Sequence, residues 1–292
     1  MSQKKILITG GNGLLGSNLI KALSLNYKII ALVRILPEIK IEQVDYYACD
    51  FETQWDVDAL PTDIFAIIHL AQSEKFRDFP NYAIDVFNVN VFSTVRLLDF
   101  AKKNGVKKFI FSSTGGVYKK GLDAVSENTP INTFGTLGNY LATKFCAEIL
   151  MHNYSDFFDV LVLRIFFMYG EGQKNSMLIP RLAASVKNGT PIKINTNGGI
   201  KINPIHVKDV VNLFPKILEL NDSLTFNVAG PEVLTIRDIA QLFGKEINKE
   251  PIFEYTEDDN ASLVANIDLL CEKLSMPKTR LEDSLSEILN SL

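Results

Sequence analysis

The chain has 292 residues, of which 47% are hydrophobic and 22% are charged, with a formal net charge of −4 and a pI of about 5.5. This length and composition are typical of a globular protein with one large domain or two modest ones. The acidic balance argues against a general nucleic-acid binder, because phosphate backbones are held chiefly by Lys and Arg.

The sequence shows no feature of a membrane, disulfide-bonded or metal-binding protein. Arg164 interrupts the best apolar run, residues 160–168, and the apolar run near the N-terminus stops at Thr9. We therefore predict a cytoplasmic protein without a membrane span. His, Cys and carboxylates do not cluster at ligand spacing, so we expect no metal. The widely separated cysteines are Cys49, Cys146 and Cys271.

The chain opens with a buried-strand run over residues 6–8, then glycines three apart, then an amphipathic helix over about 14–26. Gly10 permits a tight turn, Gly13 lets the backbone approach a pyrophosphate, and Gly16 lets the helix pack on the strand. Free amides and the helix dipole favour an anion there. Such glycines also occur in plain tight turns, but their place between strand and helix favours a dinucleotide cradle. The expected cofactor contacts are Gly10, Gly13, Leu14, Leu15 and Gly16.

The next two strands are predicted at 28–33 and 44–48, and the residues after them bear on the choice of cofactor. A carboxylate at the end of the second strand would bind the ribose of NAD, but Arg34 stands there and suits a 2′-phosphate. NADP is therefore favoured over NAD, unless Arg34 is a solvated loop residue. Asp50 and Phe51 are expected to contact the adenine; alternatively, Asp50 caps the next turn.

Strand-like runs then alternate with helical patterns, which predicts an α/β fold with a Rossmann-type doubly wound parallel sheet and a smaller C-terminal substrate-binding lobe. Gly and Pro become frequent between 170 and 204, where the chain is expected to cross into that lobe. We predict a dinucleotide-binding domain over 1–168, with 203–230 returning to it, and a substrate lobe over 169–202 and 231–292. Further strands are expected at 65–70, 109–112, 161–165 and 226–230, and further helices at 84–104, 139–153, 235–243 and 281–289.

Tyr140 and Lys144 are four residues apart in a helical segment, so their side chains project from one face. An adjacent ammonium stabilises a phenolate and lowers the phenol pKa toward neutral pH, which suits proton transfer. Thr114, at the end of a predicted strand, is our choice for the hydroxyl that orients a substrate oxygen. Such a Tyr-Lys pair alone is usually a helix surface feature, but the glycine cradle and the hydroxyl cluster make it more specific.

Further motifs follow the same order along the chain: His69-Leu70-Ala71, Asn88-Val89-Asn90 with Thr94, Ser112 to Tyr118, Tyr140 to Lys144, Arg164 to Gly170, Ile205 to Val210 and Phe226 to Gly230. With them, nearly the whole chain resembles the extended short-chain dehydrogenase/reductases, the NAD(P)-dependent epimerase/dehydratase family. The resemblance implies Thr114, Tyr140 and Lys144 as catalytic residues, with Tyr140 and Lys144 also contacting the cofactor. It further implies Leu70 and Ala71 as cofactor contacts, and a homodimer formed through the two long helices.

Departures from the family pattern bear on the substrate. Gly115 and Gly116 replace the acidic pair of sugar dehydratases, so dehydration is not expected. Phe167 and Ile202 are apolar where many members place Asn and Arg against a nucleoside diphosphate, and only Lys201 is basic nearby. Lys119 and Lys120 could receive an anion or form a solvated loop. The expected substrate contacts are Thr114, Gly115, Phe167, Lys201 and His206, with His206 as a core or hinge residue beside the pocket.

The sequence thus predicts an NADP-dependent oxidoreductase or epimerase that acts on a carbonyl or secondary alcohol, most plausibly of a nucleotide-activated sugar. Hydride would move to or from the nicotinamide while Tyr140 serves as acid or base. One alternative is a reductase of a non-nucleotide small carbonyl compound, favoured by Phe167 and Ile202. The other is a dinucleotide-sensing module without turnover, since a fold does not guarantee activity.

Overall fold

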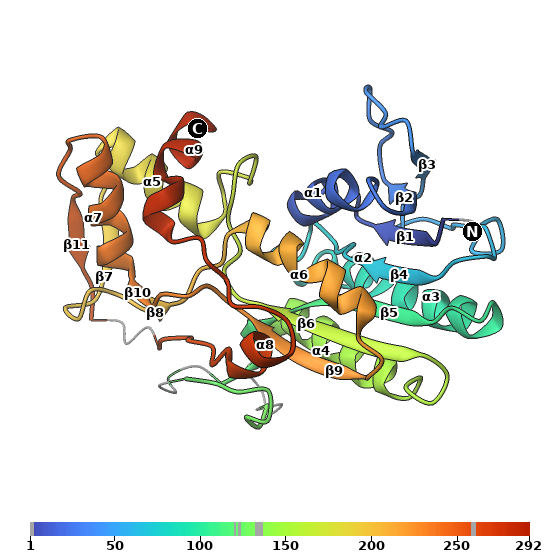
Figure 1. The fold of residues 1–292 in the computed structure, drawn as a ribbon. Helices are drawn as coiled ribbons and strands as arrows, with labels where there is room; N and C mark the ends of the chain where they lie inside the picture. Colours follow the sequence, from blue (N-terminus) through green and yellow to red (C-terminus); the bar gives the residue numbers. More distant parts are fainter. Residues whose placement is uncertain (1–2, 120, 122–123, 132–136, 258–260) are drawn as a thin grey trace. The chain divides into compact units, whose positions relative to one another are not determined.

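The computed structural model describes residues 3–119, 121, 124–131, 137–257 and 261–292 (Figure 1). The chain forms two compact units. The first unit is drawn from Met1–Val117, Ile131–Arg164 and Phe214–Phe226, and the second unit from Tyr118–Pro130, Ile165–Leu213 and Asn227–Leu292. The predicted domain ranges place 118–130, 165–168, 203–213 and 227–230 with the nucleotide domain, whereas these segments group with the second unit. The assignment of a separate function to each part stays a prediction.

A seven-stranded sheet forms the centre of the first unit, in the order β3-β2-β1-β4-β5-β6-β9. β1 pairs in parallel with β2 and with β4, so that Ile6 lies opposite Ile29 on one side and Ala66 on the other. This order is the one expected of a Rossmann-type doubly wound sheet. The strands are β1 Lys5–Thr9, β2 Lys28–Val33, β3 Val44–Ala48, β4 Ala66–His69, β5 Lys108–Thr114, β6 Asp159–Ile165 and β9 Leu224–Val228.

Helices cover both faces of this sheet, with α1 on one side and α3 and α4 on the other (Figure 1). Leu97 and Leu98 of α3 and Met151 of α4 pack into a core with β-strand residues such as Leu7 and Phe109. Because both faces are covered, β1 and β4 carry continuous apolar runs rather than an alternating pattern. The helices are α1 Leu14–Leu23, α2 Ala83–Phe87, α3 Ser93–Lys103 and α4 Gly138–His152.

The single helix predicted over 84–104 is interrupted between α2 and α3 by one wide π-helical turn, η1 Asn88–Phe92. Ser93 and Thr94 donate side-chain hydrogen bonds to the carbonyls four residues earlier, at 2.6 and 2.8 Å. The Asn90 amide turns inward and bonds two other segments. Side-chain bonds of this kind compete with regular helix geometry, and π-turns are frequent at functional sites.

The second unit has its own apolar core between α5, α7 and α9. Thr235 begins α7 with a capping box to Asp238, which confirms the predicted capped helix. The predicted final helix starts as the short turn η3 Leu281–Ser284. The remaining elements are η2 Gly115–Val117, α5 Leu178–Asn188, β7 Ile192–Ile194, β8 Lys201–Ile202, α6 Val207–Glu219, β10 Leu234–Thr235, α7 Ile236–Glu246, β11 Phe253–Tyr255, α8 Asp268–Lys273 and α9 Leu285–Asn290.

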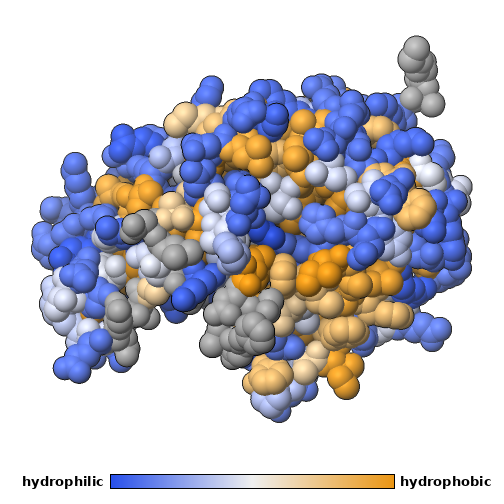
Figure 2. Space-filling model, turned by 90° about the horizontal axis from the view of Figure 1, so that it is seen from below, coloured by the Kyte–Doolittle hydropathy of each residue, from blue (hydrophilic) through white to orange (hydrophobic). Residues whose placement is uncertain are grey.

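The surface of the protein carries apolar residues that gather on the face shown in Figure 2. Exposed large apolar side chains in the first unit include Ile84 and Phe87 on α2, Phe92 on η1 and Ile149 on α4. Among the described residues, no helix combines the length and the apolar character needed to cross a membrane.

Candidate cofactor and catalytic site

Two glycines of the turn between β1 and α1, Gly10 and Gly16, have no room for a side chain. Gly10 has a φ of +69°, and a Cβ on Gly16 would lie 2.2 Å from the Gly10 carbonyl oxygen. The N-cap Gly13 offers no side-chain hydrogen bond to the first turn of α1. The amides at this helix start therefore face outward without a protein cap, which is the arrangement that binds phosphate. Leu14 is partly exposed, whereas the Leu15 side chain is 5% exposed and belongs to the core.

His69 at the end of β4 holds the neighbouring loop in place. Its Nδ1 lies 2.7 Å from the Thr9 hydroxyl, which also accepts hydrogen bonds from the amides of Leu70 and Ala71 at 3.1 Å. Its Nε2 lies 3.0 Å from Thr94 Oγ1, a hydroxyl that donates to the Asn90 carbonyl. These partners require the tautomer protonated on Nε2, and burial lowers the His69 pKa to about 3. Leu70 and Ala71 are thus held beside the glycine turn by a neutral histidine.

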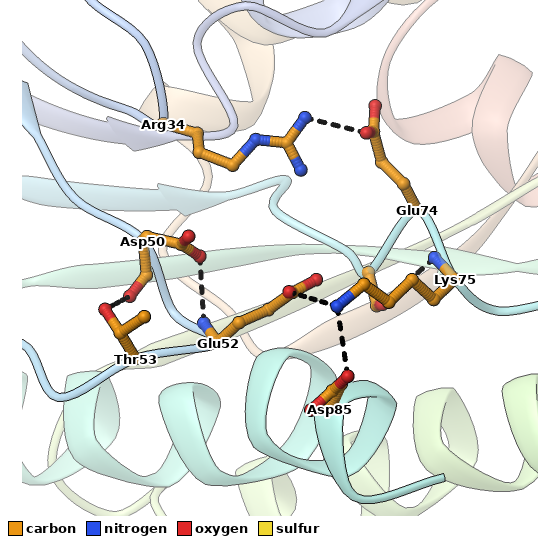
Figure 3. A network of polar contacts seen from close by, with 8 residues as sticks. Arg34, Asp50, Glu52, Thr53, Glu74, Lys75 and Asp85 are labelled. Atoms are coloured by element: carbon orange, nitrogen blue, oxygen red, sulfur yellow. Dashed lines mark hydrogen bonds and ion pairs between the residues drawn. The ribbon is translucent and has the colours of Figure 1, made fainter. Parts of the chain in front are cut away.

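Arg34, directly after β2, is engaged by an acidic residue from another loop. Its Nη2 donates to Glu74 Oε2 at 2.7 Å, and the two side chains point toward one another in Figure 3. Asp50 accepts a hydrogen bond from the Glu52 amide at 3.0 Å. This is the turn-capping role that the sequence offers as the alternative to an adenine contact. Phe51 is 7% exposed and packs on Trp55 with ring centroids 4.7 Å apart. Phe51 thus belongs to the core, and its contact with the adenine stays a prediction.

The helix α4 presents Tyr140, Lys144 and Glu148 at intervals of four residues, on one face. The Tyr140 hydroxyl donates to Gln72 Oε1 at 3.1 Å, and its ring packs on Phe76 at a centroid distance of 4.8 Å. Lys144 Nζ donates to the Ser112 carbonyl at 2.8 Å and lies 4.8 Å from the centre of the Phe111 ring. Among the described residues, no hydrogen bond joins Tyr140 directly to Lys144.

Burial dominates the protonation of both groups. It raises the Tyr140 pKa to about 12 and lowers the Lys144 pKa to about 7, where the Glu148 carboxylate opposes the lowering. The predicted lowering of the Tyr140 pKa by Lys144 is therefore wrong in direction for this structure. The amine is directed at a carbonyl of β5 instead of at the phenol, and removal from water disfavours the phenolate.

Thr114 ends β5 beside the first turn of α4. Its hydroxyl accepts a hydrogen bond from the Gly116 amide at 3.1 Å, and a Cβ on Gly116 would lie 2.8 Å from Leu141 Cδ2. The end of β5, with Thr114 and Gly116, thus packs against Leu141, the residue next to Tyr140. Gly115 is buried in the short turn η2, so only its backbone can face a ligand.

Polar residues that the sequence did not single out as site residues hold this arrangement together. Asn90 accepts from the Ser73 amide at 3.0 Å and donates to Thr143 Oγ1 at 3.0 Å, so it joins the loop after β4 to α4. Arg164 of β6 binds Glu148 through Nε and through Nη2, the latter at 2.7 Å, and Ser113 donates to the same carboxylate. Buried polar residues in apolar strands and helices are the sequence signal that could have identified them.

The second unit holds the other predicted substrate residues. Phe167 has a φ of +43°, which is uncommon for a bulky residue, and packs against that unit's core. Ile202 is fully buried in the same core, whereas the Lys201 side chain is exposed. His206 is fully buried; its Nδ1 accepts from the Lys208 amide and its Nε2 lies 3.2 Å from Glu287. Both ring nitrogens are thus engaged within the protein, as expected of a core residue. Lys120 lies outside the described residues.

Within the part of the chain that the structure describes, no group of three or more His, Cys, Asp or Glu residues could hold a metal ion.

Known proteins resemble the chain in sequence and in fold. The family described as "NAD dependent epimerase/dehydratase family" matches residues 6–229. The chain is 25% identical to an uncharacterized UDP-glucose epimerase, YtcB, of Bacillus subtilis (strain 168), over 97% of this chain and 96% of that protein. It is 28% identical to dTDP-D-glucose 4,6-dehydratase of Dictyostelium discoideum, over 82% of this chain and 61% of that protein. A structure of UDP-Glucuronic acid 4-epimerase from Bacillus cereus in complex with NAD matches with a TM-score of 0.86 at 25% identity, covering 98% of this chain and 96% of that one.

Proposed function

Because the chain belongs to the NAD dependent epimerase/dehydratase family, it is an enzyme, and we propose that it is an epimerase or reductase of a nucleotide-activated sugar. The alternative of a sensing module without turnover is not retained. The observation that carries the proposal is that a tight glycine turn and the set Thr114, Tyr140 and Lys144 are built into one sheet and its helices.

A dinucleotide fits the turn between β1 and α1. A Cβ on residue 16 would collide with the Gly10 carbonyl oxygen. Glycine at this position therefore allows the close approach of α1 to the turn. Amides at the start of α1 would hold the pyrophosphate, and the loop carrying Leu70 and Ala71 would lie beside the bound molecule. When bound, the nicotinamide supplies the hydride donor or acceptor.

The side chains of this unit supply the proton chemistry. With its pKa raised by burial, Tyr140 is protonated at neutral pH and can donate to a substrate oxygen in place of Gln72. Transfer in the opposite direction requires a phenolate, which burial of Tyr140 disfavours while Lys144 donates to the Ser112 carbonyl. The Thr114 hydroxyl, at the end of β5, orients the substrate oxygen.

The substrate class rests on the relatives and on this chain's own residues. The relatives named above act on UDP- or dTDP-linked sugars according to their descriptions. Gly115 and Gly116 lack the carboxyl groups needed to remove and return protons during loss of water, which favours epimerisation or reduction. Phe167 favours a second candidate, reduction of a non-nucleotide carbonyl compound, because its ring offers no donor to a diphosphate.

The choice between NADP and NAD depends on Arg34. Its position after β2 suits a 2′-phosphate, and this is the basis of the NADP prediction. Its ion pair with Glu74 weighs against that prediction, since the guanidinium is already neutralised within the protein. The UDP-Glucuronic acid 4-epimerase from Bacillus cereus, whose structure is named above, was solved in complex with NAD.

We also propose that the protein is a homodimer. Ile84, Phe87, Phe92 and Ile149 expose apolar surface on α2, η1 and α4. Burial of such surface against a second copy is the usual way to remove it from water.

The proposal predicts that Tyr140→Phe loses turnover. On a panel of UDP- and dTDP-sugars and small ketones, we expect the variant's kcat to fall by at least about 100-fold, because the proton donor is removed. Dinucleotide binding and the circular dichroism spectrum should be retained. Tyr47→Phe, on the exposed edge strand β3, is the matched control and should keep full activity. Full turnover by Tyr140→Phe on any identified substrate would overturn the assignment.

A further inference from the structure

The contact between Arg34 and Glu74 joins two loops at the cofactor edge of the sheet. Arg34 follows β2, where a carboxylate ordinarily receives the ribose hydroxyls of NAD. Glu74 comes from the loop after β4, forty positions further along the chain, and its Oε2 accepts from Arg34 Nη2 at 2.7 Å. Each side chain is 48% exposed, so both remain accessible to a ligand (Figure 3). An acid from another loop thus lies at the tip of the Arg34 side chain.

The surroundings of this pair are acidic. Lys75, the other cation in the network, is held by Glu52 at 2.6 Å and by Asp85 at 3.0 Å. Asp50 lies in the same network through the Glu52 amide, and with Glu74 and Glu52 it raises the Arg34 pKa. Among the residues labelled in Figure 3, four carboxylates accompany the two cations Arg34 and Lys75, so these six side chains together carry a charge of −2.

The two cofactors respond differently to this charge. The 2′-phosphate of NADP would have to displace Glu74 from Arg34 and then remain close to several carboxylates, with repulsion that water only partly screens. The 2′-hydroxyl of NAD is neutral and donates a hydrogen bond, which a carboxylate accepts well. The same arrangement thus weakens the binding of NADP and offers a hydrogen-bond acceptor to NAD.

We infer that Glu74 makes this enzyme selective for NAD: its carboxylate neutralises Arg34 and supplies the acceptor for the adenosine ribose that the end of β2 lacks. This inference rests on the proposed function, because it requires a dinucleotide in the cradle. It revises the expectation drawn from Arg34 alone.

Equilibrium titration of NADH and NADPH tests the inference without an assay of turnover. The protein, freed of copurifying nucleotide, is titrated with each dinucleotide by calorimetry as wild type, Glu74→Gln and Arg34→Ala. Glu282→Gln is the control, since Glu282 is 50% exposed and forms a comparable surface pair with Arg280. We expect wild type to bind NADH more tightly than NADPH. Glu74→Gln should lower the ratio of the NADPH and NADH dissociation constants by up to about fivefold, the scale of one exposed ion pair.

Arg34→Ala separates the roles of the two side chains. It keeps the Glu74 carboxylate, so NADH should bind within about twofold of wild type while NADPH binds no better. Tighter binding of NADPH than of NADH by wild type, or a ratio unchanged by Glu74→Gln, would overturn the inference while leaving dinucleotide binding intact. Failure of both dinucleotides to bind would overturn the proposed function together with it.

Discussion

At the scale of single residues, Lys144 shows how burial and charge compete. The side chain is 1% exposed, and removal from water disfavours its charged form, whereas Glu148 on the next turn favours it. The result is a pKa of about 7 in place of 10.5. The amine therefore changes its charge near physiological pH, which is the range in which a proton-transfer site operates.

This shift predicts a pH dependence of stability. Between about pH 7 and the ordinary lysine pKa of 10.5, the unfolded chain binds the Lys144 proton and the folded chain does not. The contribution of Lys144 to stability is therefore fully present above pH 10.5, and it is lost as the pH falls toward 7. We expect the free energy of unfolding to rise with pH by up to about 1.4 kcal/mol per unit from this group.

Urea unfolding at several pH values measures this slope. The useful window is about pH 7 to 8.5, below the ordinary cysteine pKa of 9.0, because the raised pKa of Cys49 contributes with the opposite sign above it. Lys144→Met should remove the contribution while keeping a side chain of similar length. Equal slopes in wild type and variant would show that Lys144 does not titrate in this range.

At the scale of elements, a buried ion pair fastens α4 to β6. Glu148 is 1% exposed and Arg164 is 6% exposed, and they meet through more than one hydrogen bond. Ser113 of β5 donates to the same carboxylate, so three elements converge on it. Because Lys144 lies on the same helix face, this contact also fixes the rotation of α4 that presents Lys144 and Tyr140.

Removal of one charge from this pair should be costly. Glu148→Gln removes the carboxylate charge that faces buried Arg164, and we expect the free energy of unfolding to fall by about 3 kcal/mol. The double variant Glu148→Gln, Arg164→Met should recover most of this loss, since neither position of the pair then holds a buried charge. Chemical denaturation of wild type and the two variants measures both effects.

An exposed ion pair serves as the comparison. Asp99 and Lys103 form a 2.7 Å contact on the surface of α3, and Asp99→Asn should change stability by less than about 0.5 kcal/mol. If Glu148→Gln were no more destabilising than Asp99→Asn, the buried pair would contribute no more to stability than an exposed one.

At the scale of the whole molecule, the apolar side chains on α2, η1 and α4 predict self-association. Sedimentation at micromolar concentration should give twice the 32.7 kDa mass of the chain. Ile149→Glu places a charge on α4, where the wild-type side chain is 51% exposed, and should yield monomers. Leu25→Glu, at a position 79% exposed after α1, should remain dimeric. A wild-type protein that sediments as a monomer would contradict the homodimer.

The fold was predictable because its signals are local. The strands at 28–33 and 44–48 were predicted with the bounds that the structure gives, and Thr235 was recognised as the start of a helix. Periodicity, capping and glycine spacing each act within one element, so a single stretch of sequence contains the whole signal. The π-turn at residues 88–92 was missed because Asn90 takes its partners from two other segments.

Local sequence patterns identified the residue types that could do the chemistry: the glycines after β1, and Tyr140, Lys144 and Thr114. The state of these residues depends on the folded arrangement. It paired Arg34 with Glu74, directed Lys144 toward Ser112 and Tyr140 toward Gln72, and placed Phe51 and His206 in the core. The physical reason is that charge, pKa and hydrogen bonding depend on neighbours and on distance from water, and both are set by segments far apart in the chain.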